Sequence, residues 1–393
     1  MASTIDCEYT DRERALSLAA ILSTSFGVGI SFGMGFPLTA LTFEAWHEPK
    51  WMIGLAGAAP ALAVLLALPI APWVISRVGP IAAIAGGCFA GSIGFLALGL
   101  FESPWVWIAI RLLMSAGFAM PWLAGETWIN SVAREETRGR VIAIYAIAFF
   151  SGYAVGPIVL HALGLVGPLP FIAAALVTAI SGLPIIVGRR LAPTFAHDGE
   201  RNVASAFRLA PAAMVAAFIG GFAEITVLSL IPNVALAAGW SEGAALALLT
   251  MTTLGGVVLQ FPIGWLSDKM SRFRLMIACM IIFVMLALAL PWALTGTSVA
   301  FVIAFLTGGV ILGFYALGLA IIGERITAGN LPAVNAAFII TYQLGALVGP
   351  VCAGIAMTDD PVHGFVAIVI ATMLLSGPAL IVAERLERRG AVL

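Results

Sequence analysis

Long, nearly uninterrupted apolar segments are the feature of this sequence that most constrains its fold. A membrane helix needs about 20 consecutive apolar residues, and segments of that length recur along the whole chain, separated by charged or Pro- and Gly-rich breaks. Twelve such segments are present: Ala15–Leu41, Trp51–Ile75, Pro80–Phe101, Pro104–Ile129, Val141–Leu163, Pro168–Val187, Leu209–Leu236, Gly243–Leu266, Phe273–Leu294, Ser298–Gly323, Pro332–Met357 and Phe365–Ala383. The sequence therefore predicts an all-α membrane protein with twelve transmembrane helices.

The composition excludes the main alternatives. Of the 393 residues, 61% are hydrophobic and 10% are charged, whereas a soluble domain carries about 25% charged residues. The strands of a membrane β-barrel alternate in polarity over about 10 residues, which these segments do not. A net charge of −1 gives no basis for nucleic acid as a partner. The expected surroundings are a lipid bilayer.

The positions of the basic residues predict the orientation. Seventeen of the 19 Lys and Arg residues lie at the two ends of the chain or in the even-numbered loops; the exceptions are Lys50 in an odd loop and Arg111 inside a segment. Because basic loops stay in the cytoplasm, both termini are expected to be cytoplasmic.

The chain also repeats itself. Pro69 and Pro262 lie 193 residues apart in similar local sequences. A Gly-x-x-x-Gly-Pro motif recurs at the same offset, in Gly152, Gly156 and Pro157 and again in Gly345, Gly349 and Pro350. Glycines four residues apart allow two membrane helices to pack closely. The repeat predicts two six-helix halves, residues 1–190 and 209–393, joined by a polar linker at 191–208.

One loop carries a recognisable motif. Residues Gly264–Arg272 read Gly-Trp-Leu-Ser-Asp-Lys-Met-Ser-Arg and resemble the signature loop Gly-x-Leu-(Ala/Ser)-Asp-(Arg/Lys)-x-Gly-Arg of the major facilitator superfamily (MFS). The equivalent Pro72–Pro80 departs from it, with Ser76 where an acid is expected. The resemblance covers essentially the whole chain. It implies two halves related by a pseudo-two-fold axis, alternating access, and a small-molecule substrate near the bilayer midplane.

In the family this loop forms the cytoplasmic gate, where a carboxylate meets the positive N-terminus of a helix from the other half. The resemblance implies that Asp268 alone takes this role here. We expect Glu126 to pair with Arg77 or Arg140, and Glu324 with Lys269 or Arg272; the alternative is an ordinary interfacial ion pair worth about 0–1 kcal/mol. The segment Glu126–Asn130 is similar to a helix ending in bacterial facilitators of the drug-exporter-like or sugar-transporter-like branch.

Two charged residues stand deep inside the predicted helices. Arg111 lies about 10 Å inside the outer boundary, and Glu224 is expected at a similar depth in the seventh helix. Arg111 opens a stretch similar to the fourth-helix motif in which an arginine takes part in proton coupling. We expect the two residues to face the cavity and to pair, directly or through water or substrate; the alternatives are a structural ion pair and an arginine bonded to backbone carbonyls.

Other polar residues inside the segments either line the cavity or form hydrogen bonds between helices. The candidates for the cavity are Tyr153, Asn233, Gln260, Tyr342 and Gln343. The segment around Gly152 and Pro157 also resembles the fifth-helix motif of proton-linked exporters. Its duplication in the second half favours a packing role whatever the direction of transport.

The leading interpretation is a secondary transporter in a bacterial inner membrane that exports a small amphipathic compound, coupled to protons. Import or facilitated diffusion of a small polar solute such as a sugar is the alternative. An intramembrane enzyme is disfavoured, because none of the four histidines falls at the depth of a midplane site. A receptor is disfavoured because receptors of this fold usually carry a long appended domain or tail, which we do not expect here. We expect no cofactor beyond the proton gradient, and a functional monomer.

Overall fold

The computed structural model describes residues 9–134, 137–193, 206–326 and 330–390, and it is all-helical in these ranges. The first half contains α1 Asp11–Ala45, α2 Lys50–Ala67, α3 Ala71–Val78, α4 Pro80–Leu98, α5 Pro104–Val132, α6 Arg138–Leu163, α7 Leu169–Ser181 and α8 Leu183–Val187. The second half contains α10 Pro211–Ala237, α11 Glu242–Lys269, α12 Arg272–Ala293, α13 Thr297–Arg325, α14 Leu331–Ala356 and α15 Pro361–Gly390. Twelve spans are long and apolar enough to cross a membrane. Most of the linker predicted at 191–208 lies outside the described residues.

Local sequence explains where many helices begin. Proline stands in the first turn of α4, α5, α10 and α15, where a missing N–H group costs nothing. Thr10 and Glu13 form a reciprocal capping box before α1, and the Ser241 hydroxyl accepts a hydrogen bond from the Ala244 amide at the start of α11. These caps place the helix ends close to the boundaries of the apolar segments.

The second predicted span differs from the prediction. It is expected to run from Trp51 to Ile75, but α2 ends at Ala67 and a separate short helix, α3, follows the break at residues 68–70. Pro69 lies in this break and has no N–H group to continue the helix. Its counterpart, Pro262, lies inside an unbroken α11. Equivalent prolines therefore end a helix in one half and are accommodated in the other.

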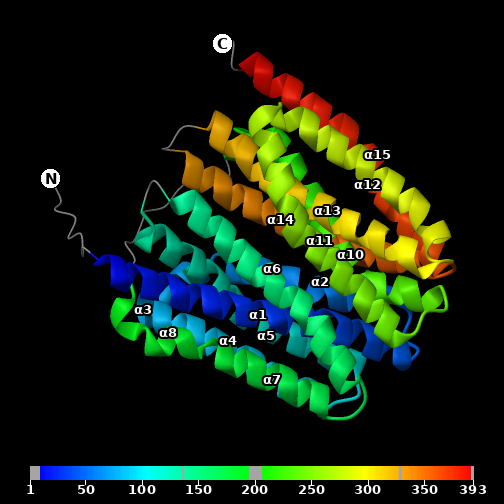
Figure 1. Cartoon of the computed structure of the whole chain (residues 1–393), viewed down its shortest axis with the longest axis horizontal. Helices are drawn as coiled ribbons and strands as arrows, with labels where there is room; N and C mark the ends of the chain where they lie inside the picture. Colours follow the sequence, from blue (N-terminus) through cyan, green and yellow to red (C-terminus); the bar gives the residue numbers. More distant parts are fainter. Residues whose placement is uncertain (1–8, 135–136, 194–205, 327–329, 391–393) are drawn as a thin grey trace.

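The packing of the helices repeats with the sequence. In the first half α1 packs against α6, α2 against α5 and α4 against α7; in the second half α10 packs against α14, α11 against α13 and α12 against α15. Figure 1 shows the first half in the lower part of the molecule and the second half above it. Between the halves, α2 contacts α14, α6 contacts α11, and α1 contacts α10.

Helix α1 begins and helix α15 ends at the same end of the bundle (Figure 1). We call this end the termini side and the other end the opposite side. The two ends lie together because an even number of spans separates them. By the distribution of basic residues, the termini side is the predicted cytoplasmic side.

The repeated glycines lie where helix backbones nearly touch. A Cβ atom added to Gly156 would stand 2.3 Å from the carbonyl carbon of Gly33 in α1, and one added to Gly345 would stand 2.1 Å from the carbonyl oxygen of Phe218 in α10. Gly152 and Gly349 are equally close to backbone atoms of α1 and α10. Only glycine permits these two crossings at their present separation.

We expect Gly156→Ala to destabilise the protein, because the added methyl group has no space between α6 and α1. Overpacking of this kind costs about 1–3 kcal/mol. The matched control is Gly86→Ala in α4, where nothing lies within 4 Å of the added methyl group. Thermal unfolding in detergent, followed by tryptophan fluorescence, should show a lower midpoint for Gly156→Ala alone. Equal midpoints for the two variants would contradict the packing role.

Candidate functional site

Arg111 is held by backbone oxygens of two other helices. Its Nε donates to the carbonyl of Ala56 in α2 at 3.0 Å, and its Nη1 donates to the carbonyl of Gly35 in α1 at 3.0 Å and to Oγ1 of Thr39 at 2.8 Å. The side chain is only 3% exposed. The guanidinium also lies 5.2 Å from the centre of the Phe36 ring, a cation–π contact. Arg111 therefore joins α5 to α1 and α2 near the opposite side.

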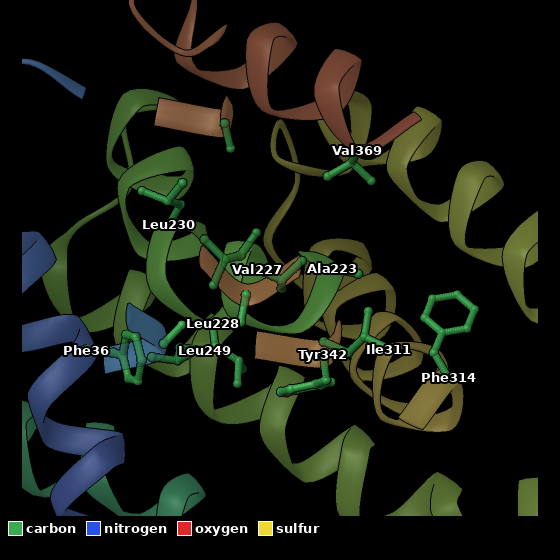
Figure 2. Packing of buried hydrophobic residues seen from close by; sticks show 14 of the residues in the cluster. Phe36, Ala223, Val227, Leu228, Leu230, Leu249, Ile311, Phe314, Tyr342 and Val369 are labelled. Carbon is green, nitrogen blue, oxygen red and sulfur yellow. The ribbon is translucent and has the colours of Figure 1, made fainter. Parts of the chain in front are cut away.

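Glu224 lies in the middle of α10 and is 6% exposed. The Tyr342 hydroxyl on α14 hydrogen-bonds its carboxylate. Tyr342 belongs to the same buried cluster as Ala223 and Leu228 of α10, and as Phe36 of α1 (Figure 2). The carboxylate of Glu224 thus sits inside a largely apolar core that both halves build.

Arg111 and Glu224 are predicted to pair directly or through water or substrate, and a direct ion pair is not among the contacts of the described residues. The reason is geometric, because carbonyl groups of α1 and α2 already take up the guanidinium. Tyr153 of α6 lies instead within electrostatic reach of both charges. Its hydroxyl is buried and has no hydrogen-bond partner among the protein atoms described. Tyr153 therefore lies close enough to both Arg111 and Glu224 to respond to either charge.

Asn233 does not line the central region as predicted. Its Nδ2 donates to the Glu44 carboxylate at 2.8 Å and to the Ala40 carbonyl at 3.2 Å, both in α1. Lys50 of α2 forms an ion pair with the same carboxylate. Within the described part of the chain, the two bonds donated by Asn233 are the hydrogen bonds that cross between the two halves. We call Glu44, Lys50 and Asn233 the opposite-side latch.

Close backbone contacts between the halves lie on the same side as the latch. A Cβ atom on Gly54 of α2 would stand 2.1 Å from the Pro350 carbonyl oxygen, and one on Gly354 of α14 would stand 2.5 Å from the Lys50 carbonyl oxygen. Gly243 of α11 lies equally close to the ring of His161, at the end of α6. The two halves are therefore locked together at the opposite side.

The predicted gate residues lie on the termini side, and most of them do not bridge the halves. Nη1 of Arg272 lies 3.2 Å from Glu324, within the second half, which is the predicted contact. Arg77 stacks over Trp73, and Lys269 stacks over Trp265 at 3.7 Å, so the repeat also reproduces this cation–π pair. Asp268 and Arg140 are exposed, and among the described residues no group of the first half donates a hydrogen bond to Asp268.

Glu126 differs most from its predicted role. It is expected to pair with Arg77 or Arg140, but its Oε1 instead accepts a hydrogen bond of 2.8 Å from Trp122 Nε1, one turn earlier in α5. Tyr145 of α6 and Tyr315 of α13 lie within electrostatic reach of its carboxylate. Within the described ranges, no Lys or Arg of the neighbouring loops forms an ion pair with Glu126.

The other predicted cavity residues lie in α11 and α14. Gln260 is half-buried, and its Nε2 atom has no partner among the described protein atoms. Gln343 is 6% exposed and follows Tyr342 in α14. Sequence reasoning missed Glu44, Trp122 and Tyr315. The sequence does carry a signal for Tyr315. The chain has only 5 tyrosines, four of them inside predicted spans, so each of these four is a candidate polar group of the membrane interior.

Comparison with known proteins agrees with this architecture. The family model described as Major Facilitator Superfamily matches residues 21–212 and again residues 213–391. The chain belongs to this superfamily. It is therefore a transporter and not an enzyme, and its family implies a membrane and a small-molecule substrate.

Curated relatives are bacterial transporters of the same superfamily. The chain is 28% identical over 342 residues to the MFS-type transporter YfkF of Bacillus subtilis, which covers 83% of this chain and 85% of the relative. It is 25% identical over 308 residues to YcaD of Escherichia fergusonii, covering 77% and 79%. Neither name states a substrate.

Solved structures share the fold. A bacterial homologue of the human lysosomal transporter Spinster, in an inward-facing and unoccupied conformation, superposes with a TM-score of 0.73 at 14% identity, covering 96% of this chain and 97% of that one. A variant of the nucleoside transporter NupG superposes with a TM-score of 0.76 at 13% identity, covering 94% and 99%. At these identities the likeness shows the fold alone.

We expect Arg111→Lys to destabilise the first half, although it conserves the charge. A single ammonium on a flexible stem does not reproduce the guanidinium's fork of bonds to two helices, and each bond from a charged donor is worth about 1.5–3 kcal/mol. Thermal unfolding should show a lower midpoint than in the wild type. Lys269→Arg, on the exposed termini side, is the control and should leave the midpoint unchanged; unaltered stability of Arg111→Lys would contradict the bridging role.

We expect Asn233→Ala to favour opening of the opposite side, because it removes both described hydrogen bonds between the halves. A change of about 1.4 kcal/mol would raise the open population about tenfold. The readout is the rate of thiol labelling of Ser229→Cys, buried beneath the latch, in a cysteine-free background. Asn130→Ala, which removes only a bond within α5, is the control. Equal labelling rates in the two variants would contradict the latch.

Proposed function

We propose that this protein is a proton-coupled secondary transporter that exports a small amphipathic compound across a bacterial inner membrane. The observation that carries the proposal is Glu224, a buried carboxylate at the centre of α10 with two tyrosine neighbours and no cation bonded to it among the described residues. Ionisable residues at this depth are costly and are generally retained for function. A carboxyl group that can gain and lose a proton is the simplest coupling element that this core contains.

The alternation between the two halves supplies the transport step. With the opposite side closed by the latch and by the glycine contacts, access to the central region is expected from the termini side. Protonation of Glu224 changes its charge and its hydrogen bond to Tyr342, so it alters the contact between α10 and α14. Binding of the proton and binding of the substrate then shift the same conformational equilibrium between the two halves.

The surroundings of the site favour an amphipathic substrate. Aromatic rings from both halves contribute to the largely aliphatic buried cluster, including those of Phe36, Tyr153 and Tyr342. Arg111 is already engaged by backbone oxygens, so the described cluster offers no free cation for a strongly anionic substrate such as a phosphate. We propose that the protein works as a monomer, because both halves of the site come from one chain.

We expect Glu224→Gln to abolish transport driven by a pH gradient while the protein remains folded, because the amide cannot exchange a proton. The assay is uptake of ethidium, a lipophilic cation, into proteoliposomes with an acidic lumen, restricted to molecules whose termini side faces outward. Glu224→Asp, which keeps a titratable carboxyl group, should retain part of the activity, and Glu102→Gln, in an exposed loop, should retain all of it.

Gradient-driven uptake that persists in Glu224→Gln would overturn the assignment of the proton site. Uptake of ethidium only with the opposite gradient would overturn export in favour of import. If the wild type moves a sugar and no dye under the same gradient, the amphipathic substrate is wrong and the polar solute replaces it.

A further inference from the structure

Glu126 is the one acidic side chain of α5, and it lies on the termini side of the membrane interior. It is half-buried, in contrast to Glu224, which is 6% exposed. Among the described residues, its carboxylate accepts a hydrogen bond of 2.8 Å from the neutral Trp122 indole. Among the contacts of the described residues no Lys or Arg pairs with it. A carboxylate in such a place needs a countercharge or a proton.

The titratable groups that face Glu126 are tyrosines from two other helices. Tyr145 comes from α6, and its hydroxyl rests against Gly125, where an added Cβ atom would stand 2.9 Å away. Tyr315 comes from α13, in the other half of the protein. Both interact electrostatically with Glu126.

The same tyrosines lead on to Glu224. The Tyr315 ring packs edge-on against the Tyr342 ring at 5.2 Å between centres, and Tyr342 hydrogen-bonds Glu224. Tyr315 also lies within electrostatic reach of Glu126 and of Glu224 at the same time. The chain of polar groups therefore starts at a half-buried carboxylate in the first half and ends at a buried one in the second.

We propose that Glu126 is a second proton-binding site of this protein, and that Tyr145, Tyr315 and Tyr342 join it to Glu224 in one polar path across the two halves. The role of Glu126 in transport rests on the proposed function, but the inference that Glu126 binds a proton does not. A tyrosine hydroxyl both donates and accepts. Each hydroxyl can therefore pass on its own proton as it receives one, directly or through a bridging water, and no charge is left on the path.

The arrangement also accounts for the lack of a Lys or Arg partner for Glu126 among the described residues. A gate carboxylate works as a fixed negative charge paired with cations. Glu126 lies instead at the half-buried end of the path, where Tyr145 and Tyr315 are also half-buried, while Tyr342 and Glu224 at the other end are buried. That is the position of an entry site for a proton moving toward Glu224 from the termini side.

The test is an infrared titration of the purified full-length protein in detergent, without substrate. Protonated carboxyl groups absorb separately from carboxylates, and their band depends on the surroundings of each group. We expect two membrane-embedded bands that titrate with pH; Glu126→Gln should remove one, and Glu224→Gln should remove the other. Glu102→Gln, an exposed acid outside the spans, should leave both. Thermal unfolding establishes that each variant is folded.

A Glu126→Gln spectrum identical to that of the wild type would overturn the second site. Loss of the Glu126 band with no band assignable to Glu224 would instead overturn the proton role of Glu224 in the proposed function and leave Glu126 as a proton-binding group. The two failures are therefore distinguishable.

A further variant tests the path. Tyr315→Phe keeps the ring against Tyr342 and removes the hydroxyl that both acids sense. If the path is real, Glu224→Gln changes the titration midpoint of the Glu126 band, and this change is smaller when Tyr315→Phe is also present. An equal change with and without the Tyr315 hydroxyl would overturn the role of Tyr315 in the path.

Discussion

Two close helix crossings hold the central polar groups in place. Where α6 meets α1, a Cβ atom on Gly33 would stand 2.1 Å from the Tyr153 carbonyl oxygen, and where α14 meets α10, one on Gly221 would stand 1.9 Å from the Tyr342 carbonyl oxygen. The two tyrosines that flank Glu224 thus belong to two crossings at which the helix backbones nearly touch. Any residue larger than glycine would separate the helices and move the hydroxyl groups away from the acid.

The second constraint is that polar groups inside a membrane protein must find partners within it. Arg111 satisfies this condition with backbone oxygens of α1 and α2, and Glu224 satisfies it with Tyr342. The two charges are consequently not paired with one another. In the function that we propose, the carboxyl group of Glu224 gains and loses a proton, while the arginine is a positive charge that joins three helices.

The contacts between the halves are distributed unevenly along the membrane normal. The opposite-side latch and the Gly54 and Gly354 contacts join the halves on one side. On the termini side, the motif residues Asp268 and Lys269 remain exposed. The closed side is therefore held by direct backbone contact and hydrogen bonds, and the halves separate there only when those contacts break.

The sequence by itself determined the twelve spans, the internal repeat, the superfamily resemblance and the tight packing around Gly156 and Gly349. These features depend on apolar length and on local spacing, which the chain carries without reference to its neighbours. It also identified Arg111 and Glu224 as the charges deep inside the spans. Only the tertiary structure decided their partners, because a side chain's neighbours come from helices that are distant in sequence. Depth along a helix predicts which residues share a level, but the rotation of each helix decides whether Glu126 faces a basic loop or Tyr145.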